Sequence, residues 1–204
     1  MRARGEDWTE ALDLVLARGF YQRAALAVAR DLLGKVLVHR TARSIRVGRI
    51  VETEAYVGEH DLACHASHGR TPRTEVMFGP AGHAYVYLVY GMHWCFNAVT
   101  GATGEAAAVL VRGVEPLGGI PETERTDGPG RLTRALRIGR AENGADLTGA
   151  CLCILDGPAP ARGTMRRGPR VGVDSSGVWA SRPFRFWVEG SRGVSRVPSR
   201  RGVR

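Results

Sequence analysis

The spacing of apolar residues changes near position 35, and this change separates predicted helices from predicted strands. Leucine and alanine recur at helical spacing in residues 9–17 and 22–33, and Gly34 stands where a left-handed residue ends a helix. Beyond it, residues 36–38 and 44–56 alternate between apolar and polar, which is typical of paired strands. We therefore expect two short amphipathic helices followed by a β-hairpin.

The strand pattern returns later in the chain. Residues 83–89 and 93–99 flank a turn at Gly91, and residues 107–114 predict the next strand. Residues 128–139 predict a helix with one apolar face. Further strands are expected at residues 151–155, 170–173 and 184–188. Together these elements predict an α+β fold, in which short helices flank a curved, mainly antiparallel sheet.

One long segment follows neither pattern. Residues 57–80 contain glycines, prolines and histidines but few apolar residues. Long irregular segments inside compact domains are usually functional. We expect this segment to fold over a site.

Composition and charge predict where the folded domain ends and which class of partner it binds. The chain of 204 residues has no composition break in its middle, so residues 1–190 are expected to form one domain. Residues 157–204 hold eleven arginines and two acidic residues, so this part alone accounts for 11 − 2 = +9, the whole net charge. Such clustering favours nucleic acid, although an anionic membrane surface satisfies the same arithmetic. Residues 191–204, rich in glycine, serine and arginine, are expected to be a flexible tail.

Cysteine usage and hydropathy indicate a cellular location. The four cysteines match no secreted framework, and no charged-then-apolar leader opens the chain. Apolar stretches stay well below the roughly 20 residues that cross a bilayer. We expect reduced thiols, no membrane association and a cytoplasmic or nucleoid-associated protein.

Two carboxylates stand close together in the second predicted strand. Residues 50–56 read Ile-Val-Glu-Thr-Glu-Ala-Tyr, and strand alternation places Glu52 and Glu54 on one face together with Ile50 and Tyr56. A carboxylate beside a second carboxylate and an aromatic ring is a candidate general base. The plainer alternative is that both glutamates are exposed, or paired with arginines earlier in the strand.

Aromatic residues are concentrated in one short segment. Residues 85–94 hold three tyrosines, a histidine and a tryptophan in a chain that is only 7% aromatic. Tyr85 is interpreted as an ordinary cross-strand residue, whereas Tyr87 would lie beside Glu54 if the strands pair. Tyr90 is next to the turn glycine, where its ring would project from the hairpin tip. A projecting ring suits a protein that extrudes a base and fills the vacated stack.

Many short motifs in fixed order match one known family. They are residues 33–38, 48–56, Asp61 with His65, 71–73, 85–91, Asn97, 109–112, Glu115 with Pro116, and Gly128 and Pro129 with Leu132. In these motifs the chain resembles the alkyladenine (3-methyladenine) DNA glycosylases over roughly residues 24–188. The resemblance implies a fold similar to the formyltransferase C-terminal domain, with a β-hairpin projecting toward DNA.

The resemblance also implies an activity and a set of site residues. It implies base excision repair by a monofunctional enzyme, acting as a monomer without a cofactor or metal. This enzyme flips alkylated purines out of double-stranded DNA and hydrolyses the N-glycosidic bond; the candidate lesions are 3-methyladenine, 7-methylguanine, hypoxanthine and ethenoadenine. Glu54 would activate the attacking water with help from Arg112. The other implied roles are pocket walls for Tyr56, His65 and Tyr87, rejection of guanine for Asn97, intercalation for Tyr90, and hairpin contacts for Met92 and His93.

Basic residues outside the pocket are candidates for contacts with the DNA backbone. Arg131, Arg134 and Arg137 recur three residues apart on the predicted helix of residues 128–139, so they share a face. Arg73 is a candidate for the same role, or for capping its own loop. Lys35 is the only lysine. Apart from the chain terminus it is the only amine for a Schiff base, so no lyase activity is expected.

Two other classes of protein compete with this interpretation. A non-catalytic nucleic-acid-binding module would use a related curved sheet, as the C-terminal domain of methionyl-tRNA formyltransferase does to hold tRNA, and would not need Glu54. A zinc-dependent nuclease would draw on the cluster of histidines and cysteines between residues 60 and 95. Their spacing forms no paired ligand motif, so the cysteines are interpreted as packing residues.

Overall fold

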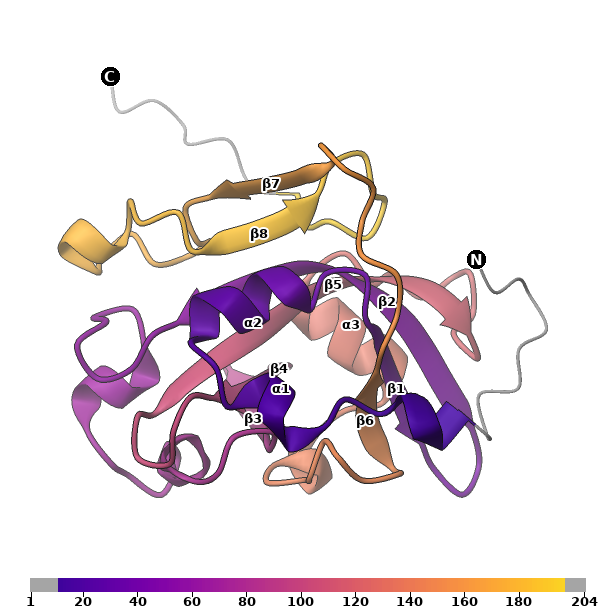
Figure 1. The fold of residues 1–204 in the computed structure, drawn as a ribbon, viewed down its shortest axis with the longest axis horizontal. Helices are drawn as coiled ribbons and strands as arrows, with labels where there is room; N and C mark the ends of the chain where they lie inside the picture. Colours follow the sequence, from indigo (N-terminus) through magenta and orange to yellow (C-terminus); the bar gives the residue numbers. More distant parts are fainter. Residues whose placement is uncertain (1–10, 197–204) are drawn as a thin grey trace.

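The computed structural model describes residues 11–196 and consists of a curled antiparallel sheet with short helices packed against it (Figure 1). The strand order is β3-β4-β5-β2-β1-β6, while β8 pairs with β2 and carries β7 at its far edge. Every pairing between strands is antiparallel. The predicted α+β class with a curved antiparallel sheet is confirmed.

The strands are short except for two long central ones, β2 and β5. The strands are β1 (Val36–Arg40), β2 (Ile45–Tyr56), β3 (Ala84–Val89), β4 (His93–Thr100), β5 (Ala107–Gly118), β6 (Leu152–Leu155), β7 (Met165–Gly168) and β8 (Arg185–Val188). The predicted hairpins, β1 with β2 and β3 with β4, are both present. The pattern missed β7, whose two arginines break the apolar alternation.

Helices occupy little of the chain. They are α1 (Arg18–Tyr21), α2 (Ala25–Asp31), α3 (Pro129–Leu136) and the 3-10 turns Ala11–Leu14, His65–His68, Glu75–Phe78, Arg140–Glu142 and Gly177–Trp179. The helix predicted for residues 9–17 is only a 3-10 turn in its described part, and α1 begins after an extended Ala17. Gly34 has φ +88° as predicted, and a Cβ there would stand 2.1 Å from the carbonyl oxygen of Pro158. No helix among residues 11–196 has the length and apolar character needed to span a bilayer.

The main apolar core lies between the sheet and its helices. It includes Leu33 near the end of α2, Phe96 of β4, and Leu132 and Leu136 of α3, all fully or almost fully buried. On β2, the hydroxyl of Thr53 donates to the carbonyl oxygen of Ala29 at 2.7 Å and so ties α2 to the sheet. The strand that carries the two glutamates is therefore held firmly from its apolar side.

Ile50 does not share a face with Glu52 and Glu54 as predicted, because the register of β2 shifts between Ile50 and Glu52. The pairing of β2 with β5 shifts between Ile50 and Glu52, which leaves Val51 out of the ladder. Such a bulge interrupts strict alternation. Ile50 consequently joins the apolar core together with Ala55, while Glu52 and Glu54 are in a polar cluster.

Two segments near the C-terminus differ from the predictions. Residues 170–173 form no strand; they are an irregular segment whose backbone turns toward β2. Residues 191–196, predicted to begin a flexible tail, make defined contacts, and Ser195 is buried. Hydrogen bonds to a buried carboxylate order this segment in spite of its polar composition. The rest of the predicted tail lies outside the described residues.

Candidate active site

Two buried glutamates of β2 form the centre of a polar cluster. The stretch from Glu52 to Glu54 pairs with β5 on one side and with β8 on the other, so both side chains extend from a strand enclosed within the sheet. The exposed fraction of each glutamate is 0%. Carboxylates are rarely this buried unless cations or hydrogen-bond donors compensate them.

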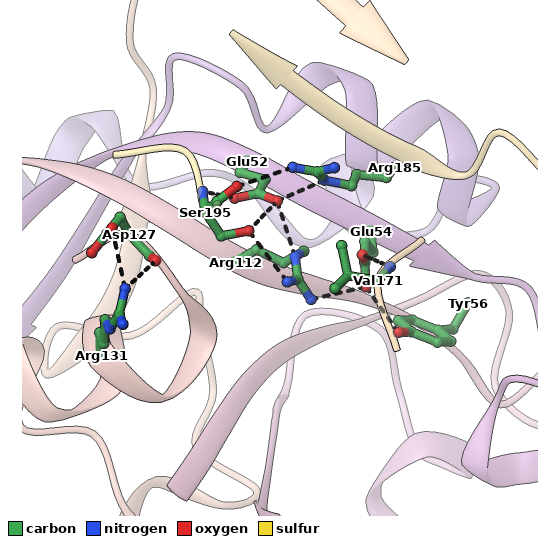
Figure 2. Close-up of polar contacts among 9 residues, drawn as sticks. All are labelled: Glu52, Glu54, Tyr56, Arg112, Asp127, Arg131, Val171, Arg185 and Ser195. Carbon is green, nitrogen blue, oxygen red and sulfur yellow. Dashed lines mark hydrogen bonds and ion pairs between the residues drawn. The ribbon is translucent and has the colours of Figure 1, made fainter. Parts of the chain in front are cut away.

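Glu54 is held by three donors (Figure 2). The hydroxyl of Tyr56 donates to its Oε2 at 2.9 Å, and Nη1 of Arg112 approaches the same oxygen at 3.3 Å. The backbone amide of Val171 donates to its Oε1 at 2.7 Å. These donors come from β2, from β5 and from the irregular segment near residue 171. Together they compensate for the burial of this carboxylate.

Glu52 is the more heavily bonded of the two carboxylates. Its Oε1 accepts from Nε of Arg112 at 3.0 Å, from Nε of Arg185 at 2.7 Å and from the hydroxyl of Ser195 at 2.8 Å. Arg112 thus bridges both carboxylates. Burial alone would lower the pKa of Arg112, but the attraction of Glu54 and Glu52 outweighs burial and raises that pKa. Arg112 is therefore a permanent cation at the centre of the cluster.

A cavity of about 530 Å³ opens beside Glu54. This volume is within the range of roughly 300–1,000 Å³ that is typical of small-molecule sites. All four predicted pocket residues line it, as do all three groups that donate to Glu54: the lining includes Tyr56, His65, Tyr87, Asn97, Arg112 and Val171. The carboxylate consequently lies directly behind the wall of an aromatic cavity.

The aromatic walls are organised by ring contacts and by two arginines. The rings of His65 and Tyr87 meet edge to face with centroids 4.5 Å apart. Arg73 lies over the ring of Tyr87 at 5.1 Å, and Arg170 lies over the ring of Tyr56 at 4.7 Å. A nitrogen of His65, Nδ1, is 2.9 Å from the hydroxyl of Tyr85. Tyr85 therefore orients a wall residue in addition to its role in strand pairing.

The aromatic residues of the cavity wall are electrically neutral near neutral pH, although two arginines, Arg73 and Arg112, also line the cavity. Burial, followed by the charges of Arg73 and His68, lowers the pKa of His65 to about 4. Burial also raises the pKa of Tyr56 and that of Tyr87 well above the ordinary value for a phenol. A cationic ring entering the cavity would thus meet neutral aromatic surfaces.

Asn97 also lines the cavity. It is buried on β4, opposite Leu110 of β5, and its Nδ2 donates to the carbonyl oxygen of Tyr85 at 3.0 Å. This bond fixes the orientation of the amide. A fixed amide is suited to discriminating among the edges of a planar ligand.

The hairpin between β3 and β4 carries the predicted intercalating residues at its tip. Tyr90 is 87% exposed and Met92 is 71% exposed, and His93 is exposed at the start of β4. Both central turn residues have positive φ, 51° at Tyr90 and 69° at Gly91. The left-handed region is energetically unfavourable for an aromatic residue, and residues with such backbone strain are often found at functional sites. Tyr90 also borders the cavity mouth.

The arginines predicted to contact the DNA backbone differ in their surroundings. Arg131 pairs with Asp127 at 3.2 Å and Arg137 with Glu124 at 3.5 Å, so acidic neighbours partly neutralise this face of α3. Arg134 is exposed, and no acidic partner for it occurs among residues 11–196. Of the three, Arg134 is therefore the one whose charge no acidic side chain of the described residues offsets.

Two of the cysteines, Cys64 and Cys95, line the cavity. Cys64 and Cys95 are buried, and burial raises the pKa of each thiol to about 11. Cys151 is exposed and lies just before β6, which begins at Leu152. In the described part of the chain, no three His, Cys, Asp or Glu residues gather into a group that could hold a metal ion.

Sequence reasoning missed most of the residues that hold the site together. Arg170 donates to Asp61 through Nη2 at 2.8 Å, and both side chains are fully buried. Asp61 and His65 belong to one motif, but nothing in the motif indicates a partner 109 residues away. Arg185 and Ser195 likewise come from a segment whose arginines suggest only surface charge. The one feature of the sequence that could have indicated the two arginines is the high density of arginine beside the predicted strands of this segment.

A cavity with aromatic walls and a buried carboxylate behind it is a candidate enzyme pocket for a ring-shaped substrate. Comparison with known proteins identifies the family: a family model described as methylpurine-DNA glycosylase matches residues 19–192. The chain belongs to the methylpurine-DNA glycosylase family. It is therefore a DNA glycosylase, an enzyme of DNA repair.

Several curated relatives match nearly the whole chain. A relative from Myxococcus xanthus is 60% identical over 183 residues, which cover 90% of this chain and 94% of the relative. One from an Anaeromyxobacter species is 55% identical over 184 residues, with 90% and 93% covered. One from Legionella pneumophila strain Corby is 47% identical over 182 residues, with 89% and 98% covered. All three are named, provisionally, as 3-methyladenine DNA glycosylases.

Proposed function

We propose that this enzyme extrudes an alkylated purine nucleotide from double-stranded DNA and hydrolyses its N-glycosidic bond with a water activated by Glu54. The main support is the convergence of Tyr56, Arg112 and Val171 on the carboxylate of Glu54 while all three line one cavity. A base in the cavity would have its sugar carbon next to this wall. That the protein acts as a monomer stays a prediction.

The carboxylate of Glu54 has one hydrogen-bond acceptor position left for a water. Among the described contacts, Oε2 of Glu54 accepts two hydrogen bonds, whereas Oε1 accepts only the one from Val171. A carboxylate oxygen has two lone pairs, so Oε1 retains one that can receive a proton. Glu54 is therefore the candidate base that takes the proton from the water.

The proposed hydrolysis moves one proton and one electron pair. The oxygen of the water forms a bond to the sugar C1′ as its proton passes to Glu54. The bond from C1′ to the purine nitrogen breaks, and its electron pair stays on the departing base. For a purine that carries a positive charge from alkylation, this pair neutralises the leaving group. No covalent intermediate with the protein is needed.

The neutral aromatic rings of the cavity wall favour cationic purines over neutral ones. A positively charged ring stacks well on Tyr56 and Tyr87, and alkylation also weakens its glycosidic bond. Asp61 balances the charge of Arg170 beside Tyr56, and the two glutamates balance that of Arg112. Arg73, over the ring of Tyr87, is the cation of the wall that works against this preference. A neutral lesion needs a proton donor, and the low pKa of His65, about 4, makes this wall residue a poor one near neutral pH. We therefore place 3-methyladenine and 7-methylguanine before hypoxanthine and ethenoadenine as substrates.

Glu54→Gln tests the proposed chemistry. The amide keeps the size of the side chain but cannot accept the proton from water, so release of methylated purines from alkylated duplex should fall at least about 100-fold. Binding to the same duplex should persist. Glu122→Gln, which neutralises an exposed glutamate, is the matched control and should retain full release.

The outcomes separate the competing classes of protein. Full activity of Glu54→Gln would refute the role of this residue. A wild-type protein that binds duplex but releases no purine would point to a non-catalytic module. Strand cleavage that a chelator abolishes would indicate a metal-dependent nuclease.

A further inference from the structure

The segment of residues 191–196, near the C-terminus, contributes Ser195 to the polar cluster (Figure 2). The backbone amide of Ser195 donates to Oε2 of Glu52 at 2.6 Å, and its hydroxyl donates to Oε1 at 2.8 Å. The same hydroxyl accepts from Nη2 of Arg112 at 3.3 Å. One serine thus contacts both the second carboxylate and the arginine that reaches Glu54.

Close backbone packing holds this segment in place. A Cβ added at Gly113 of β5 would stand 2.1 Å from the carbonyl oxygen of Gly193, and one added at Gly193 would stand 2.5 Å from the carbonyl oxygen of Val114. Only glycine allows two backbones to approach so closely. The hydroxyl of Ser191 adds an anchor by donating to Glu115 at 2.6 Å. The approach that delivers Ser195 to Glu52 therefore depends on both glycines.

Arg112 forms hydrogen bonds to both glutamates, and its contacts with Glu52 and Ser195 set the orientation of its guanidinium group. Arg112 donates through Nε to Glu52 at 3.0 Å and through Nη1 to Glu54 at the longer distance of 3.3 Å. Two cations, Arg112 and Arg185, face two carboxylates in this cluster. Without the hydroxyl of Ser195, Nη2 of Arg112 would lose its acceptor, and the guanidinium would be freer to rotate away from the geometry in which Nη1 reaches Glu54.

We propose that Ser195 and Glu52 are positioning residues that fix Arg112 against Glu54, so that the chain up to Ser195 is part of the apparatus for base release. The inference rests on the proposed function of Glu54. Neither residue lines the cavity that would receive the base. Both would therefore act on the rate of bond cleavage rather than on the binding of DNA.

Two variants test this inference in the full-length protein. Ser195→Ala removes the hydroxyl that links Glu52 and Arg112, and single-turnover base release should fall about tenfold. Gly193→Ala places a Cβ against the backbone of Val114, which displaces the segment and both contacts of Ser195. Its release rate should fall about 100-fold, since a misplacement of about 1 Å in a supporting group can cost that much. The dissociation constant for lesion duplex should stay within about threefold of the wild type for both variants.

Thr53→Val is the matched control. It removes a buried hydrogen bond from the same strand, but from the face that packs on α2. Its thermal stability should fall while its release rate stays at the wild-type value. If Thr53→Val slows release as much as Ser195→Ala does, or if Ser195→Ala releases base at the wild-type rate, the inference is wrong. A fall in duplex affinity parallel to the fall in rate would overturn it as well.

The same assay distinguishes failure of this inference from failure of the proposed function. If the wild-type protein releases purines and Glu54→Gln does not, the function stands whatever Ser195→Ala shows. If the wild-type protein releases none, both proposals fall together.

Discussion

Replacing Tyr90 with asparagine should separate stability from function at the hairpin tip. The side chain is 87% exposed, so its removal costs little buried apolar surface. Its φ of 51° is in the left-handed region, which costs a non-glycine residue about 1–2 kcal/mol but suits asparagine better. Tyr90→Asn should therefore leave the free energy of unfolding unchanged, or raise it by up to about 1 kcal/mol.

The same substitution removes the ring that would fill the gap left by an extruded nucleotide. Stacking of a base on an aromatic side chain is worth about 1–3 kcal/mol. At about 1.4 kcal/mol for each factor of ten, the loss corresponds to roughly 5- to 150-fold weaker binding of a duplex with an extruded nucleotide. Tyr90→Phe keeps the ring and should bind like the wild type.

This prediction is tested by measuring the duplex affinity and the free energy of unfolding on the same protein preparations. The binding assay would use a duplex that contains a stable abasic-site analogue, and urea unfolding would report stability. Val178→Ala, which shortens another exposed apolar side chain, controls for general loss of surface contacts. If Tyr90→Asn binds the duplex as tightly as the wild type, the ring does not occupy the stack. If Tyr90→Asn unfolds more readily, the strain assigned to this turn is wrong.

Two further predictions concern the residues that support the cavity. Because the pKa of His65 is lowered to about 4, the unfolded chain takes up its proton first as pH falls below about 6.5, so folding stability should fall with pH. His65 is partly exposed, so its share is at most about 1.4 kcal/mol per pH unit. Urea unfolding at neutral and mildly acidic pH should show a shallower dependence for His65→Gln, and an unchanged dependence would contradict the shift. Asp61→Asn would leave Arg170 as a buried cation without its partner and should lower the free energy of unfolding by about 3–5 kcal/mol; a loss below about 1 kcal/mol would mean that this pair contributes little.

Local patterns in the sequence determined the main elements of the fold and the residues along each strand. Alternation with a period of two predicts β1 to β5, because side chains on successive positions of a strand point to opposite faces. The proximity of Tyr56 to Glu54, and the place of Tyr90 beside the turn, follow from the same spacing. A resemblance carried by short ordered motifs then predicts the family, and comparison with known proteins confirms it.

Only the tertiary structure decided which charges meet. The alternative of pairing Glu52 and Glu54 with arginines of their own strand is wrong: Arg46 pairs with Glu124, and Arg49 with Glu115. A bulge after Ile50 changes the face of that residue, and no periodicity predicts where a strand will admit an extra residue.

The contact that completes the polar cluster joins residues 143 positions apart. Glycine and serine near a chain end indicate flexibility when only composition is considered. Ser195 becomes ordered because Glu52, buried in β2, needs donors that its own neighbourhood does not supply. Burial creates that need, and burial is a property of the folded chain rather than of any local stretch of sequence.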